Sequence, residues 1–414
     1  MIVSVKIVYL NPAGQIGGAE RVLLDIMASL KASDPDYRPY LLTGAAGPLV
    51  ERAAAVGVPV TVLPFPPELA RLGDGGAGGP AGSQIGRLSL LMRLIKAGGN
   101  VAVYFRRLRR ALKQLGPDII HTNGFKMHLL GLLARPNRIP VVCHIHDYLS
   151  ARPFMSRILP RLTPRCAALI AVSNSVAADV RTVCGDQVPV RTIYNAVDLD
   201  HYSPVGPRLD LDRLSGLPPA PMETVRVGLF ATMARWKGHE VFLKAISQLP
   251  DELAVRAYVI GGALYQTDGS QCSIPELRNL AAQLGLSHKV GFTGFIDESA
   301  AAMRACDIIV HASTRPEPFG LVIVEGMACE RAVVVSNAGG ASELITHGVD
   351  ALGHPPGDVK ALARHLETLV MNESLRLKLA QCGYVNATRR FERTVMGGEM
   401  LSLYRDVAAL NQVI

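Results

Sequence analysis

Two glutamates follow an apolar, strand-like run near residue 310 and have the chemistry to bind a polar ligand. Glu317 stands in a loop interrupted by Pro316 and Pro318, and Glu325 follows eight residues later, in the expected start of a helix. Backbone N–H groups at a helix N-terminus bind phosphates, and carboxylates accept hydrogen bonds from pairs of hydroxyls. The alternative is two solvated glutamates that the helix dipole favours at that place.

Two cations, Arg235 and Lys237, follow a second strand-like run, residues 225–231. Open parallel sheets bind their ligands at the carboxyl ends of strands. A diphosphate has several acceptor oxygens, so a forked guanidinium and a mobile ammonium suit it. Surface charges near a turn are common, and this pair alone does not establish a site.

A glycine-containing loop, residues 11–20, links the first strand-like run to an amphipathic helix and includes Gly17 and Gly18. Such a loop lets the backbone approach an anion. Its spacing is not Gly-x-Gly-x-x-Gly, and no acidic residue follows about 20 positions later, as a nicotinamide dinucleotide site requires. A tight turn without a ligand is the alternative.

The elements that would position these residues alternate between short apolar runs and helical patterns. Continuous apolar strands separated by helices predict a parallel sheet covered on both faces. Two series of runs predict an α/β protein with two Rossmann-like, doubly wound domains. The first series covers residues 3–10, 39–43, 59–64, 118–122, 141–146, 168–173 and 190–194, and the second covers 225–231, 255–260, 290–295, 308–312 and 332–336.

The domain boundaries follow from composition. Residues 1–198 form the expected N-terminal domain, 199–224 a proline-rich linker, and 225–393 the C-terminal domain. After residue 357 the pattern is purely helical. Residues 73–86 contain seven glycines, which predicts a loop.

In combination, these segments resemble family four of the retaining glycosyltransferases, which have the GT-B fold. The resemblance covers nearly the whole chain in the expected order. It rests on Glu317-x7-Glu325, Arg235-x-Lys237-Gly238, Gly17-Gly18, Asn195-Ala196-Val197-Asp198, Gly291-Phe292-Thr293-Gly294 and Asn337-Ala338-Gly339-Gly340-Ala341-Ser342-Glu343. It implies two domains facing a cleft, with a last helix, about 394–414, that packs back on the N-terminal domain.

The resemblance also implies roles toward a nucleotide sugar. Glu325 would bind the ribose, Arg235 and Lys237 the diphosphate, and Glu317 the hydroxyls of the transferred sugar. The backbone amides of Phe319, Gly320 and Leu321, at the helix start, would line the donor. Gly17 and Gly18 of the other domain would approach its phosphates and sugar. The base would lie beside Gly294 and Phe295 at a strand end.

His146, at the end of an N-domain strand, is the best match for a family histidine beside the reacting sugar. We expect His144 on the opposite face of that strand. A metal site is the rival interpretation, and its candidates are His121, His128, His144, His146 and Asp147. No metal-like spacing of His and carboxylates appears on one face, and the pairs Asp198-x-Asp200 and Asp210-x-Asp212 fall in the expected linker. We expect neither a metal nor another cofactor.

The expected reaction is a retaining sugar transfer to a hydroxyl of a glycan, a lipid-linked or another acceptor. Positive charge at the phosphates stabilises the departing nucleoside diphosphate. No protein nucleophile is evident, so the leaving phosphate would take the acceptor proton in a front-face attack. Alternatives are a non-catalytic nucleotide-sugar-binding subunit that acts through a partner and, less favoured, a dehydrogenase.

The net charge of +8 is unevenly distributed. Residues 1–198 carry 23 Lys+Arg and 12 Asp+Glu, a net charge of +11, so the rest of the chain has a net charge of −3. Residues 87–113 contain no acid and include Arg87, Arg93, Lys96, Arg106, Arg107, Arg109, Arg110 and Lys113. Helically spaced Leu88, Leu91, Leu94 and Ile95 favour an anionic membrane surface as partner, with a solvated helix pair as the alternative. Aromatic residues at 5% argue against nucleic acid.

The compartment follows from features that are missing. The first residues lack a signal-peptide pattern, and no apolar run approaches the ~18 residues that span a bilayer. Seven scattered cysteines with no Cys-x-x-Cys favour a reducing environment. We expect a cytoplasmic protein, peripheral on the inner face of the cytoplasmic membrane.

Overall fold

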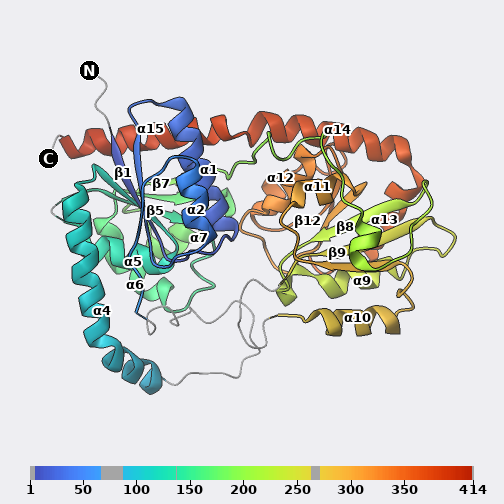
Figure 1. The fold of residues 1–414 in the computed structure, drawn as a ribbon, viewed down its shortest axis with the longest axis horizontal. Coiled ribbons are helices and arrows are strands. Elements are labelled where there is room, and N and C mark those ends of the chain that lie inside the picture. The colour runs from blue at the N-terminus through green and yellow to red at the C-terminus, as the bar shows by residue number, and fades with distance from the viewer. Residues whose placement is uncertain (1–4, 67–86, 137, 263–270, 413–414) are drawn as a thin grey trace. The chain divides into compact units, whose positions relative to one another are not determined.

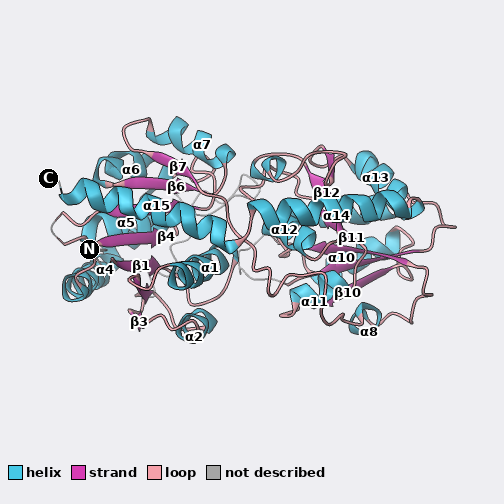
Figure 2. Cartoon of the chain, turned by 90° about the horizontal axis from the view of Figure 1, so that it is seen from above, coloured by secondary structure: helices cyan, strands magenta, loops and turns pink. Residues whose placement is uncertain are grey.

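The computed structural model describes residues 5–66, 87–136, 138–262 and 271–412. The chain forms two compact units, residues 1–196 with 393–414, and residues 197–392. Each contains one parallel sheet with helices packed along its strands (Figures 1 and 2).

Unit 1 is built on a seven-stranded sheet with the order β3-β2-β1-β4-β5-β6-β7. Its strands are β1 (Lys6–Asn11), β2 (Arg38–Thr43), β3 (Val60–Val62), β4 (Ile119–Asn123), β5 (Val141–Ile145), β6 (Ala168–Ala171) and β7 (Val190–Thr192). Its helices are α1 (Gly18–Ser33), α2 (Pro48–Ala55), α4 (Arg87–Leu115), α5 (Phe125–Ala134), α6 (Met155–Leu162), α7 (Asn174–Cys184) and α15 (Arg393–Gln412). Strands β4, β5 and β6 are buried along their whole length, which explains why β5 and β6 are mostly apolar.

Unit 2 is built on a six-stranded sheet with the order β10-β9-β8-β11-β12-β13. Its strands are β8 (Val225–Phe230), β9 (Val255–Ile260), β10 (Val290–Gly294), β11 (Ile308–His311), β12 (Ala332–Ser336) and β13 (Leu352–His354). Its helices are α8 (Leu211–Ser215), α9 (His239–Ile246), α10 (Ile274–Gln283), α11 (Ser299–Arg304), α12 (Leu321–Ala328), α13 (Val359–Met371) and α14 (Glu373–Arg390).

All twelve expected strands form, with ends shifted by up to three residues. The sheet of unit 2 also contains β13, which the sequence did not predict. It is three residues long and has Gly353 at its centre. It lacks the β-branched run that marked the other strands.

The expected linker, residues 199–224, instead packs on unit 2. Its helix α8 contributes a buried carboxylate, Asp212, that accepts hydrogen bonds from Arg226, Arg256 and Tyr258. Buried Arg304 also donates to backbone carbonyls of this segment, among them Pro207 at 2.8 Å. These partners are distant in sequence, so prolines and weak periodicity concealed the packing.

The C-terminal helix α15 belongs to unit 1, where it lies along α1 (Figure 1). Arg393 pairs with Asp25, and the Ser29 hydroxyl donates to the Arg393 carbonyl at 2.7 Å. Further along, the Tyr404 hydroxyl lies 2.8 Å from Nδ1 of His121 on β4. Helix α15 is therefore attached to unit 1 at both its start and its middle.

Among the described residues, no helix combines the length and the apolar character needed to cross a membrane.

Candidate functional site

Lys237 and Glu317 meet at the carboxyl end of the sheet of unit 2. Lys237 ends a short 3₁₀ turn after β8, and its Nζ lies 2.9 Å and 2.8 Å from Oε1 and Oε2 of Glu317. The ammonium also lies 4.1 Å from the ring centre of Trp236. The two side chains are about 21% and 9% exposed, so this ion pair is largely removed from solvent.

The carboxylate of Glu317 has two further partners that the sequence analysis missed. The Ser313 hydroxyl donates to Oε2 at 2.8 Å, and Nε2 of His311 lies 3.1 Å from the same oxygen. Burial alone would raise the pKa of Glu317, but Lys237 and His311 outweigh it and hold that pKa well below its usual range. Glu317 is therefore a carboxylate at any physiological pH. The only sequence signal for these two partners was their spacing, because positions 311 and 313 are two residues apart at a strand end.

Backbone contacts hold the two loops together. The Thr314 N–H donates to the Trp236 carbonyl at 2.7 Å, and Gly340 N–H donates to the Glu317 carbonyl at 2.7 Å. Gly238 has φ +80°, and a Cβ there would lie 1.9 Å from the Ala312 carbonyl oxygen. A larger residue at 238 would push the Lys237 loop away from the strand that precedes Glu317.

Helix α12 begins beside these loops and carries the second glutamate. Gly320, at φ +102°, precedes its first residue, Leu321. Phe319 is 3% exposed and packs edge-on against Phe391 of unit 2. Glu325 lies in the second turn of α12 and is buried. The N-terminal N–H groups of α12, Glu325 and Glu317 thus belong to one continuous loop–helix segment.

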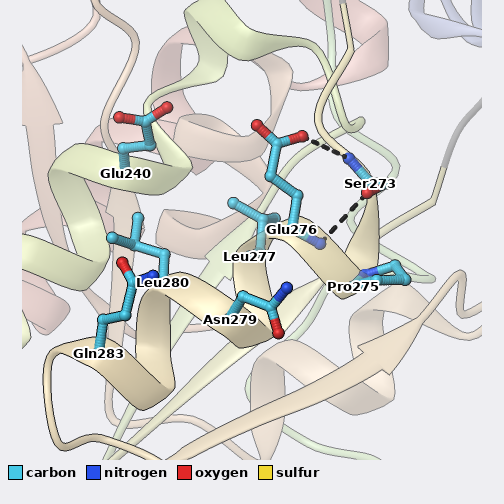
Figure 3. A pocket seen from close by; sticks show the side chains of 8 residues that line it. All are labelled: Glu240, Ser273, Pro275, Glu276, Leu277, Asn279, Leu280 and Gln283. Carbon is cyan, nitrogen blue, oxygen red and sulfur yellow. Dashed lines mark hydrogen bonds between the residues drawn. The ribbon is translucent and has the colours of Figure 1, made fainter.

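Arg235 is directed elsewhere in this structure. Its guanidinium forms a forked ion pair with Glu276, at 2.7 Å and 3.1 Å, and lies 4.0 Å from Glu240. Glu276 also completes the capping box of α10 with Ser273 (Figure 3). The structure therefore brings Lys237 to Glu317 but does not bring Arg235 to either.

A surface hollow of about 560 Å³ has Glu276, the partner of Arg235, in its lining (Figure 3). It is lined by Glu240 and by α10 with its capping residue: Ser273, Pro275, Glu276, Leu277, Asn279, Leu280 and Gln283. None of the residues predicted to bind the donor is in this lining.

The proposed base-binding residues end strand β10. Gly294 has φ +73° with open space at its Cβ position. Phe295 is 55% exposed, unusually high for a phenylalanine. An exposed ring beside an open backbone position is an available surface for stacking.

In unit 1, Gly17 caps α1 and Gly18 is the first residue of that helix. The Gly17 N–H donates to Oε2 of Glu20 at 3.0 Å. Burial raises the pKa of Glu20 although the hydrogen bond from Gly17 opposes the shift. The φ of Gly17 is −104°, which any residue adopts, so backbone conformation does not require a glycine at position 17.

His146 directly follows β5, with its Nε2 2.5 Å from Oδ1 of Asn123 at the end of β4. The expectation that His144 points to the opposite face is wrong, because the two ring centres lie 4.1 Å apart. Residues two positions apart in a strand share a face. Burial, with a contribution from His128, lowers the pKa of His146 to about 3, so His146 is neutral at physiological pH.

The other histidines of unit 1 are buried between strands and helices. His121 and His144 meet edge to face at 5.3 Å, and His128 bonds the Thr122 hydroxyl through Nδ1. In the part of the chain that the structure describes, no three His, Cys, Asp or Glu side chains are arranged to hold a metal ion.

Two family models match adjacent parts of the chain. Residues 16–201 match Glycosyltransferase Family 4, and residues 220–385 match Glycosyl transferases group 1. A D-inositol 3-phosphate glycosyltransferase of Xylanimonas cellulosilytica is 30% identical over 69% of this chain and 71% of its own length. An alpha-D-kanosaminyltransferase of Streptomyces kanamyceticus is 25% identical over 75% of this chain and 83% of its own.

Solved structures share the fold of each unit. Anabaena Alr3699/HepE, crystallised with UDP and glucose, aligns with a TM-score of 0.78 and 28% identity over 96% of this chain and 98% of its own. The complex of the same protein with UDP-glucose gives a TM-score of 0.77. Two Rossmann-like parallel-sheet units, both family models and these relatives agree: the chain belongs to the group 1, family 4 glycosyltransferases and has the GT-B fold.

Proposed function

We propose that the enzyme is a retaining, metal-independent glycosyltransferase that moves a sugar from a nucleoside-diphosphate sugar to an acceptor hydroxyl. The observation that carries this proposal is the ammonium of Lys237, fixed by the buried carboxylate of Glu317 next to the N-terminus of α12. An ammonium has three N–H donors, and an oriented cation beside a helix N-terminus suits a diphosphate. The complexes of the HepE relative with UDP and UDP-glucose support a nucleotide-sugar donor.

In this proposal, the bond between the anomeric carbon and the phosphate oxygen breaks, and the acceptor oxygen bonds that carbon on the same face. The acceptor proton passes to the departing phosphate oxygen. Lys237 and the α12 amides at Phe319, Gly320 and Leu321 stabilise the negative charge that develops there. Because these groups supply positive charge at the phosphates, the mechanism needs no divalent cation.

The remaining roles follow from the placement of each residue. We assign the ribose to Glu325, the base to Gly294 and Phe295, and the transferred sugar to Gly17, Gly18 and His146. Glu317 orients Lys237 in addition to any contact with the sugar. Arg235 would reach a phosphate only by leaving Glu276, so we assign it a smaller part than Lys237.

A thermal-shift panel of uridine, guanosine and adenosine diphosphates and their sugars, each with and without a chelator, tests this function. We expect one nucleotide series to raise the melting temperature equally in both conditions. Product NMR with a competent acceptor should then show the anomeric configuration of the donor. Stabilisation that requires a metal, or an inverted product, would contradict the proposal, and donor binding without turnover would indicate a non-catalytic subunit.

The acceptor side is proposed to contact an anionic membrane surface through α4, with the enzyme in the cytoplasm. In the described part of α4, residues 99–115, Tyr104, Leu108 and Leu112 are buried. The basic residues Arg106, Arg107, Arg109, Arg110 and Lys113 are exposed. The side chains of Arg87, Arg93, Lys96 and of the apolar set from Leu88 to Ile95 lie outside the described residues. The described part therefore favours electrostatic attachment over insertion of apolar groups.

All seven cysteines are free thiols, which suits a reducing compartment.

Replacing Arg106, Arg107 and Arg110 by alanine is expected to weaken binding to acidic vesicles by about 100-fold at low salt. The estimate takes ~1 kcal/mol for each basic residue near an anionic surface. Sedimentation with phosphatidylglycerol-containing vesicles measures the effect, and vesicles of neutral lipid give the baseline. The control variant removes the exposed basic residues Lys360, Arg364 and Lys378 of unit 2. Equal binding by both triple variants would contradict a specific role of α4.

A further inference from the structure

A chain of hydrogen bonds connects the glycine loop of unit 1 to His146, and its first links have a fixed polarity. Asn11, the last residue of β1, donates from Nδ2 to the Ala13 carbonyl at 2.7 Å and to Oε1 of Glu20 at 3.4 Å. A backbone carbonyl only accepts hydrogen bonds, so the amide nitrogen of Asn11 must face Ala13. The amide oxygen of Asn11 therefore faces the other way, toward Asn123.

The next links transmit this polarity to the imidazole. Asn123 donates from Nδ2 to Oδ1 of Asn11 at 2.7 Å and lies 3.4 Å from the Ala19 carbonyl. Its own Oδ1 then faces Nε2 of His146 at 2.5 Å. An amide oxygen cannot donate, so Nε2 of His146 must carry the hydrogen. In a neutral imidazole the other nitrogen, Nδ1, is then an acceptor.

The surroundings of His146 keep its ring uncharged. The ring of His144 lies against it, and Asn123 and His144 are themselves almost fully buried. The titratable or charged groups nearby are His121 of β4, His128 of α5, His144 of β5, Glu20 of α1, Tyr404 of α15 and the Asp147–Arg152 pair after β5. The Asp147 carboxylate is paired with Arg152, and Glu20 reaches His146 only through two amides. No carboxylate among these groups hydrogen-bonds the imidazole to stabilise its charged form.

We propose that Asn123 is a positioning residue that fixes His146 as the neutral tautomer with its hydrogen on Nε2, so that Nδ1 accepts a hydrogen bond from a hydroxyl of the bound sugar. The inference rests on the proposed function for the assignment of His146 to the sugar. The tautomer itself follows from the contacts of Asn11 and Asn123 alone. A donor sugar that lacks the hydroxyl in question would lose this contact, whereas one that offers only an acceptor there would be rejected.

The first test measures the tautomer without any substrate. Two-bond proton–nitrogen NMR spectra of protein labelled in the histidine rings distinguish hydrogen on Nε2 from hydrogen on Nδ1, and His146→Gln assigns the signal. We expect His146 to remain neutral with hydrogen on Nε2 from pH 5.5 to pH 8. A signal with hydrogen on Nδ1, or a mixture of the two tautomers, would overturn the inference, whether or not the protein transfers sugar.

The second test uses Asn123→Asp, which keeps the shape of the side chain but places one carboxylate oxygen against Nε2 of His146 and the other against Oδ1 of Asn11, where the wild type has a donor. An adjacent negative charge raises the pKa of a histidine, and the imidazolium has no lone pair on Nδ1. We expect kcat/KM of this variant to lie below the wild-type value already at pH 8, because the hydrogen bond to Asn11 is lost, and the ratio of variant to wild type to fall at least a further tenfold between pH 8 and pH 5.5. The NMR signal should show the imidazolium over the same range.

Asn372→Asp is the matched control, because it adds the same charge at an exposed helix cap whose oxygen accepts the Leu375 N–H at 2.9 Å. Its pH profile should follow that of the wild type. If the Asn123→Asp profile also runs parallel to wild type, Asn123 does not control His146. A misfolded Asn123→Asp protein would leave the wild-type NMR spectrum as the decisive measurement. If the wild-type protein shows no sugar transfer at all, the proposed function is contradicted, but the tautomer measured by NMR is unaffected.

Discussion

Lys237→Ala is expected to lower kcat for sugar transfer by about 100- to 1000-fold while unit 2 stays folded. Removing one preorganised donor from a developing anion costs about that factor. Lys237 can stabilise the departing diphosphate because Glu317, in the loop that leads into α12, holds its ammonium at 2.8–2.9 Å. Steady-state kinetics with the nucleotide sugar found by thermal shift measures the change, and circular dichroism confirms the fold.

Arg235→Ala is the comparison that makes this test specific. The Arg235 side chain is 43% exposed and already occupied by Glu276, so we expect a loss of less than about tenfold, well short of that for Lys237. Replacing both cations should abolish measurable turnover. Equal losses in the two single variants would mean that Arg235 leaves Glu276 to bind the diphosphate, and near-normal kcat for Lys237→Ala would exclude the proposed mechanism.

Glu317→Gln tests whether Lys237 and Glu317 act as one unit. The amide keeps the volume of the side chain but removes the charge that orients the ammonium. Because each side chain works through the other, the double variant Lys237→Ala/Glu317→Gln should be little worse than the worse single variant. Fully additive losses in kcat would show that Glu317 contributes through a separate contact with the sugar.

Asp212→Ala is expected to destabilise unit 2 by about 3–5 kcal/mol, the usual effect of leaving buried charges unpaired. Its carboxylate accepts hydrogen bonds from Arg256 at 2.9 Å, Arg226 at 3.2 Å and Tyr258 at 2.6 Å. Trp236, the one tryptophan of the sequence, reports unfolding of unit 2 in a urea titration followed by fluorescence. The exposed Asp251, which pairs with Lys289, is the control, and Asp251→Ala should leave the midpoint unchanged.

The same carboxylate predicts how the difference between wild type and variant depends on pH. Burial alone would raise the pKa of Asp212, but its hydrogen bonds from Tyr258, Arg256 and Arg226 lower it to about 2. A lowered pKa stabilises the fold above the unfolded value near 4, and this contribution disappears as pH falls to about 2. The difference between wild type and Asp212→Ala should therefore shrink between pH 4 and pH 2. A difference that stays constant over this range would contradict the assignment.

The fold was largely predictable because its strands are buried on both faces. Ala168–Ala171, for example, is apolar at every position, and such a run is recognisable even when the exact ends of the strand are shifted by two or three residues. The packing of residues 199–224 was not predictable, because Asp212 finds its partners in β8 and β9. Short β13 lacked any apolar run that could be recognised.

The candidate site was predictable only where local spacing determines it. Glu317, Gly320 and Glu325 follow one another in a single loop and helix, so their order was visible in the sequence. The partner of Arg235 was not, because Glu276 lies on a different helix. Asn11 and Asn123 belong to separate strands, and only the parallel register that places β1 beside β4 brings their amides together.

The return of α15 to unit 1 has a consequence for biosynthesis. A ribosome makes the chain from the N-terminus, so residues 197–392 are complete before Arg393 and Tyr404 emerge to meet Asp25 and His121. Unit 2 is one uninterrupted segment, so all its strands have been synthesised before residue 393. Unit 1 is incomplete until α15 has been synthesised. Unit 1 therefore matures after unit 2, and it lacks the α15 partners of Asp25 and His121 until residues 393–404 have been made.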